Sequence, residues 1–106
     1  MKKLLIMAAL LHYSVCGMAA VTSMGDRSCG KWIEGRKSPD APYALAHESW
    51  LAGYLSGYAA ATGSDFLSKA DGPELVQWIT KFCMDNPSKN VSAGAKEIAS
   101  ILNRRK

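Results

Sequence analysis

Residues 42–62 read PYALAHESWLAGYLSGYAAAT, twenty-one residues with one acidic residue, Glu48, and no lysine or arginine. Apolar and aromatic side chains recur in this stretch at steps of three and four, so we predict a helix over 42–62. His47 and Glu48 interrupt its apolar character, and the rest is too short for the ~20 residues that cross a bilayer. The residues on this one stripe of the predicted helix are Tyr43, Trp50, Tyr54, Gly57, Tyr58 and Ala61.

Two glycines, Gly53 and Gly57, lie one turn apart inside this predicted helix. Each glycine costs about 1 kcal/mol relative to alanine in a helix interior, so its presence calls for a compensating contact. Because a missing side chain lets a second helix approach closely, we expect close helix packing at both glycines.

Two further helices are predicted downstream, the first of them starting at Asp71. Asp71 can cap that helix, Glu74 three residues later completes a capping-box pattern, and Pro73 suits the first turn. The segment 85–87 (Asp-Asn-Pro) ends it, because the residue before a proline disfavours helical geometry. A last helix is predicted over 90–103. The apolar faces of these two helices are Leu75, Trp78, Ile79 and Phe82, and then Val91, Ala95, Ile98, Ile101 and Leu102.

A shorter helix is predicted upstream over 28–36, with Ser28 as its N-cap, and a proline-containing break separates it from the long helix. Residues 63–70 are predicted to form a loop whose Phe66 and Leu67 return to the core. The sequence therefore predicts an all-α fold, a small bundle of about four helices.

The N-terminus is typical of a cleavable secretory signal peptide. A lysine pair at 2–3 precedes eight uncharged apolar residues at 4–11, a run far too short to cross a bilayer. Gly17 and Ala19 are the small residues that signal peptidase requires, which places the mature start near Ala20. We therefore expect a periplasmic or secreted protein. The predicted organisation is a signal peptide at 1–19, a flexible lead-in at 20–27, a single helical domain at 28–103 and a basic tail at 104–106.

Other interpretations of this end of the chain stay open. Cleavage after Gly17 or Ala20 is also compatible with the pattern. Cys16 could be the lipidated residue of a lipoprotein, but Tyr13 and Val15 match that processing site poorly. A short buried helix is the remaining alternative, and such a helix rarely begins with a lysine pair.

Removal of the signal peptide leaves two cysteines, Cys29 and Cys83. An even number of cysteines in an oxidising compartment indicates a disulfide, and a domain this small gains stability from such a cross-link. Two buried free thiols are the alternative. Together with His47, the one mature histidine, these cysteines cannot form the usual zinc site, so we expect no metal and no cofactor.

The charge of the chain does not favour a nucleic-acid partner. The formal net charge is +4, and it falls to +2 once the lysines at 2–3 leave with the signal peptide. Three of the remaining positive charges lie together at 104–106. A small surplus in a solvated tail is not the basic surface of a nucleic-acid-binding domain.

Few side chains suggest chemistry. His47 and Glu48 are adjacent, but neighbours on a helix point about 100° apart and do not face one substrate. No second histidine remains in the mature chain, so we expect a surface or capping role for His47 and no enzyme activity. Trp50 is expected in the core. For Tyr54 and Tyr58, core packing and partner binding remain equal alternatives.

Three segments resemble the HdeA/HdeB family of small periplasmic helical proteins: Ser28-Cys29, WLAGYLSG at 50–57 and FCMDNP at 82–87. This resemblance implies a helical protein with one disulfide that acts as an acid-stress chaperone. More distantly, the pattern is similar to the resistance-associated (Tai) immunity proteins, which protect bacteria from type VI secreted amidases.

These observations predict an exported, non-enzymatic binding protein, an HdeA-like envelope stress chaperone. The alternatives are an immunity or inhibitor protein with one toxin or enzyme partner, and a structural envelope protein. The expected partners are a single protein or unfolded client proteins, with a possible homodimer, and without nucleic acid or a membrane span in the mature form.

Overall fold

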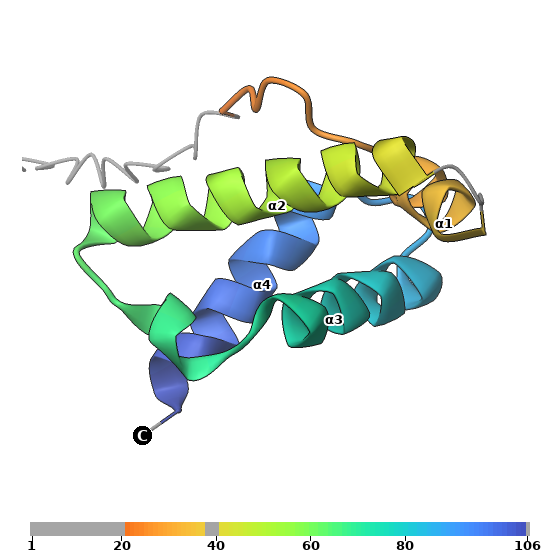
Figure 1. Ribbon diagram of the computed structural model, residues 1–106. Coiled ribbons are helices and arrows are strands. Elements are labelled where there is room, and N and C mark those ends of the chain that lie inside the picture. The colour runs from red at the N-terminus through yellow and green to blue at the C-terminus, as the bar shows by residue number, and fades with distance from the viewer. Residues whose placement is uncertain (1–20, 38–40, 106) are drawn as a thin grey trace, which may run out of the picture.

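The computed structural model describes residues 21–37 and 41–105, and this part of the chain forms four α-helices (Figure 1). They are α1 (Cys29–Lys37), α2 (Ala41–Thr62), α3 (Gly72–Asp85) and α4 (Val91–Arg104), with a short 3-10 helix, η1 (Phe66–Lys69), after α2. The predicted all-α bundle is confirmed. The predicted signal peptide at 1–19 lies outside the described residues.

The helix starts follow from capping side chains. The Ser28 hydroxyl accepts a hydrogen bond from the backbone N–H of Lys31 at 3.2 Å, which caps α1 as predicted. The Asp71 carboxylate accepts one from the N–H of Glu74 at 2.8 Å, and Pro73 lies in the first turn of α3. Both predicted caps are confirmed.

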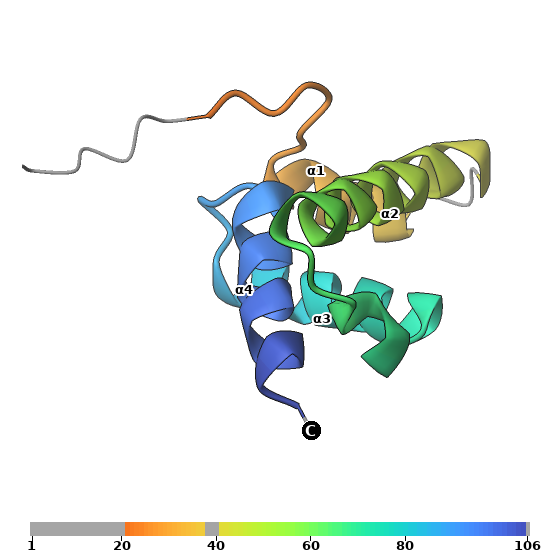
Figure 2. The same cartoon turned by 90° about the vertical axis from the view of Figure 1, so that its left-hand side faces the viewer.

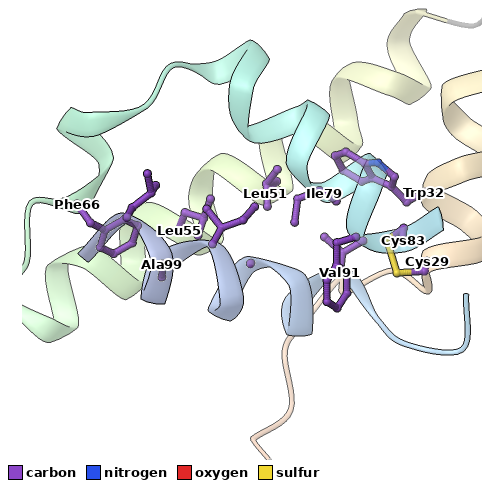
Figure 3. Close-up of a cluster of buried hydrophobic side chains, with 13 residues drawn as sticks. Cys29, Trp32, Leu51, Leu55, Phe66, Ile79, Cys83, Val91 and Ala99 are labelled. Carbon is purple, nitrogen blue, oxygen red and sulfur yellow. A yellow bond between two sulfur atoms is a disulfide. The ribbon is translucent and has the colours of Figure 1, made fainter. Parts of the chain in front are cut away.

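Helix α4 packs against α2, α3 and η1, while α1 packs against α2 and α3. Figures 1 and 2 show α2 above α3 in two views turned by 90°, with α4 crossing both. Phe66 of η1 is buried, so the predicted return of the loop to the core is confirmed. The core (Figure 3) consists of Cys29, Trp32, Leu51, Leu55, Phe66, Ile79, Phe82, Cys83, Val91, Ala95, Ile98, Ala99 and Leu102.

The buried side of α2 does not include Trp50, which was expected in the core. His47, Leu51 and Leu55, spaced by four residues, face the core, and each is at most 3% exposed. Trp50 and Tyr54 pack against the core from its edge, stacked on each other with ring centroids 5.1 Å apart. The indole N–H of a tryptophan needs an acceptor, and that of Trp50 finds it in the Met24 carbonyl, in the segment that precedes the helices. Trp50 is therefore half-buried rather than central.

The glycines at close helix contacts are also different from those predicted. Gly53 and Gly57 are exposed, and a Cβ built on either would meet nothing within 4 Å, so that prediction was wrong. A Cβ on Gly35 of α1 would lie 2.9 Å from a side-chain atom of α2. A Cβ on Gly94 of α4 would lie 2.6 Å from a ring atom of Phe82. The close approaches are therefore α1 to α2 and α4 to α3.

A disulfide joins Cys29, the first residue of α1, to Cys83 in the last turn of α3, with the Cα atoms 4.7 Å apart. Both cysteines are fully buried. One turn further along α1, the indole N–H of Trp32 donates to the Thr80 hydroxyl of α3 at 3.0 Å. The predicted cross-link between the first and third helices is confirmed.

Residues 21–27, the described part of the predicted flexible lead-in, contact the bundle at three points. The Arg27 carbonyl accepts a hydrogen bond from the Val91 N–H of α4 at 2.9 Å. The Met24 carbonyl accepts the indole N–H of Trp50 at 2.6 Å. The Asp26 carboxylate accepts hydrogen bonds from the Ser92 backbone N–H, at 3.1 Å, and from the Ser92 hydroxyl. The side chain of Asn90, the N-cap of α4, makes no cap bond, so Asp26 caps this helix from outside it.

We predict that Asp26→Ala lowers the free energy of unfolding by about 0.5–2 kcal/mol, the usual cost of losing an N-cap. Urea unfolding followed by circular dichroism measures this change. Asp65→Ala is the matched control, because Asp65 precedes η1 without a side-chain cap bond. Equal stabilities of the two variants would contradict a capping role for Asp26.

The predicted basic tail at 104–106 is partly structured. Arg104 is the last residue of α4. Arg105 pairs with Glu74 of α3 at 3.0 Å, and its guanidinium lies over the Trp78 ring, 5.2 Å from the centroid. Arg105 therefore belongs to the α3–α4 contact rather than to a solvated tail.

Candidate functional site

The outer side of α2 is exposed and uncharged. From residue 49 to 62 the helix has fourteen residues without Asp, Glu, Lys or Arg. At 100° per residue, the side opposite Leu51 and Leu55 carries only small side chains. The side of a helix that faces water usually carries charged residues, so an exposed side without any charge is unusual. We call this surface the α2 face, and its exposed residues are Ser49, Ala52, Gly53, Ser56, Gly57 and Ala60.

An open groove of about 570 Å³ borders the α2 face, between α2 and the first turns of α3. The charged residue in its lining, Glu48, is engaged by Arg36 of α1 at 2.7 Å. Most of the remaining lining is apolar, so this α2–α3 groove suits apolar side chains. It is lined by Glu48, Ser49, Leu51, Ala52, Gly72, Pro73, Leu75, Val76 and Gln77.

The two predicted partner-binding residues lie on α2 but in different surroundings. Tyr54 lines a smaller hollow of about 340 Å³ with Trp50 and Met24 on the other flank of the α2 face. Tyr58 is half-buried and meets the Phe66 ring edge-on at 6.1 Å between centroids. Both tyrosines therefore pack against the core, and Tyr54 also borders the candidate face.

A third hollow, of about 350 Å³, lies between α3 and α4. Trp78, Phe82 and Ile101 contribute apolar surface, but Lys81 and Glu97 place opposite charges at its rim. Because charged and apolar side chains both line this α3–α4 hollow, it is a weaker candidate than the α2–α3 groove for binding an apolar segment.

His47 was expected at the surface or at a helix cap, and this expectation was wrong. Its ring is 3% exposed and packs against Gly35 of α1. The ring centroids of Tyr43 and Trp32 lie 4.3 Å and 6.1 Å from that of His47. The absence of a side chain at Gly35 makes room for the imidazole, a relation between two helices that spacing within α2 does not reveal.

In the described ranges, 21–37 and 41–105, no group of three or more His, Cys, Asp or Glu is placed to hold a metal ion. The helices of these ranges also include none that is long and apolar enough to span a bilayer.

Comparison with protein-family models, with curated proteins and with solved structures finds no match to this chain.

Proposed function

We propose that this chain is an exported, non-enzymatic protein-binding domain that shields unfolded proteins of the cell envelope, as its resemblance to the HdeA/HdeB family implies. The N-terminal signal pattern supports export. The uncharged α2 face with its adjoining groove supports protein binding and carries the proposal.

The chemistry of the α2 face fits a segment of an unfolded protein. Such segments expose apolar side chains without a fixed shape, and a shallow uncharged surface accepts many of them. The α2–α3 groove adds an apolar slot beside this surface, lined by Leu51, Leu75 and Val76. Because Arg36 neutralises Glu48, the groove imposes little charge selection on its occupant.

We predict that Ala52→Glu weakens client binding at least about tenfold, because a carboxylate in the groove must lose its water without gaining a partner. Ala52 is exposed on the groove wall, so the domain should still fold. Ser100→Glu adds the same charge on the exposed side of α4 and is the matched control. The assay is light scattering of a denatured enzyme diluted from guanidinium chloride, without reductant.

The wild type and Ser100→Glu should suppress aggregation, and Ala52→Glu should not. Failure of the wild type to protect, or equal protection by both variants, would overturn the proposal. Sedimentation velocity on the same samples tests whether a second copy occupies the α2 face instead. If the wild type is a dimer and Ala52→Glu is a monomer, the partner of the α2 face is a second copy of this chain rather than an unfolded client.

A further inference from the structure

His47 is the one polar or charged side chain in the buried set of the described residues. Its imidazole lies between α1 and α2, against Gly35, with Trp32 and Tyr43 beside it. Neither Nδ1 nor Nε2 has a hydrogen-bond partner in the described part of the chain. A buried polar atom without a partner destabilises the folded state, so a histidine at this position is unfavourable even when it is neutral.

The charged groups around this ring oppose a second proton on it. Arg36 of α1 and Arg27, which precedes α1, both contribute positive charge at His47. Glu48, the neighbouring carboxylate on α2, is bound to Arg36 at 2.7 Å. The other titratable group in contact with the imidazole is Tyr43, whose ring centroid lies 4.3 Å from that of His47. Burial, and then the two arginines, therefore lower the pKa of His47 from its ordinary value.

We propose that His47 is an acid-sensitive latch between α1 and α2, which is closed while the imidazole is neutral and opens when it gains a proton. Opening separates the first half of α2 from α1, whereas the Cys29–Cys83 bridge keeps α1 attached to α3. His47 lies one turn before Leu51, which lines the α2–α3 groove, so opening also moves a groove wall. A link between the latch and client binding rests on the proposed function, but the latch itself does not.

The direction of the pH effect follows from proton linkage. Above about pH 6.5 the histidine is neutral in both the folded and the unfolded chain, and the latch contributes no pH dependence. Below that value the unfolded chain binds a proton that the folded chain resists, so the folded state loses stability as the pH falls. The unfolding equilibrium constant rises by up to about tenfold per pH unit until the folded His47 also titrates.

Two measurements on the exported protein test the latch. With residues 1–19 removed as predicted, His47 is the single histidine, so its Hε1 resonance is unambiguous in a proton NMR titration. We expect a midpoint clearly below 6.5, or unfolding before the folded ring titrates. Urea unfolding from pH 7.5 to 5 should show the rise in the unfolding constant for the wild type and a nearly flat profile for His47→Gln.

Glu97→Gln is the control, because it removes an exposed carboxylate that lines the α3–α4 hollow and does not contact His47, so the wild-type profile between pH 7.5 and 5 should remain. A folded His47 that titrates at 6.5 or above overturns the latch, as do parallel profiles for the wild type and His47→Gln. Neither measurement contains a client, so failure of the latch and failure of the proposed function remain distinguishable.

Discussion

Replacing both Cys29 and Cys83 with alanine is expected to lower the free energy of unfolding by about 4 kcal/mol. The bridge closes a loop with a sequence separation of 54 residues, and the chain-entropy estimate for a loop of that length gives this value. The free energy of unfolding of a protein is typically about 5–15 kcal/mol in total, so the disulfide contributes a large share of it. Alanine avoids placing hydroxyl groups in the buried positions of the two sulfur atoms.

Guanidinium chloride unfolding with and without reductant measures this contribution. The wild type should lose stability when reduced, and the double alanine variant should not respond to reductant. A reduced wild type as stable as the oxidised one would contradict the account of the bridge as the main cross-link of the fold.

Two glycine substitutions of the same kind are expected to have opposite effects. In Gly94→Ala the new Cβ would lie 2.6 Å from Cδ1 of Phe82 and 3.1 Å from Cδ1 of Ile79. Overpacking of this kind costs about 1–3 kcal/mol. The better helix propensity of alanine offsets only about 1 kcal/mol of that cost, so we expect a net loss of stability. In Gly57→Ala nothing lies within 4 Å of the new Cβ, so only the gain in helix propensity remains.

Thermal unfolding of the two variants beside the wild type tests this contrast. Gly94→Ala should melt below the wild type and Gly57→Ala at or above it, since 1 kcal/mol shifts the midpoint by roughly 4–8 °C in a domain of this size. A lower midpoint for Gly57→Ala than for Gly94→Ala would reverse our assignment of the close helix contacts.

The helix boundaries could be predicted because their causes are local. Ser28 and Asp71 accept hydrogen bonds within their own first turns, and the segment 85–87 stops α3 with its own proline. The disulfide was predictable from the count of cysteines and the expected compartment. The helix ends depend on residues a few positions apart in the sequence. The disulfide follows from there being two cysteines to pair, whichever helices carry them.

The packing of α2 could not be predicted in the same way. Helical spacing marks the aromatic stripe and the pair Gly53 and Gly57, but which side is buried depends on α1 and α4. The space for His47 comes from Gly35, and the acceptor for Trp50 comes from Met24. The groove also joins residues far apart in sequence, because α2 forms one wall and α3 the other. The uncharged run at 49–62 was the available signal for the candidate face.

The most direct test of the proposed binding face is an NMR titration of the ¹⁵N-labelled exported protein with an unlabelled, permanently unfolded client. Reduced and carboxymethylated α-lactalbumin serves as that client, and no reductant is present. Glycine amides report on the surfaces: Gly53 and Gly57 on the α2 face, Gly72 in the groove, and Gly94 in the α3–α4 hollow. We expect the first three signals to shift or broaden while those of Gly94 and Gly30 stay unchanged. Changes at Gly94 alone, or no change with excess client, would contradict the assignment of client binding to the α2 face.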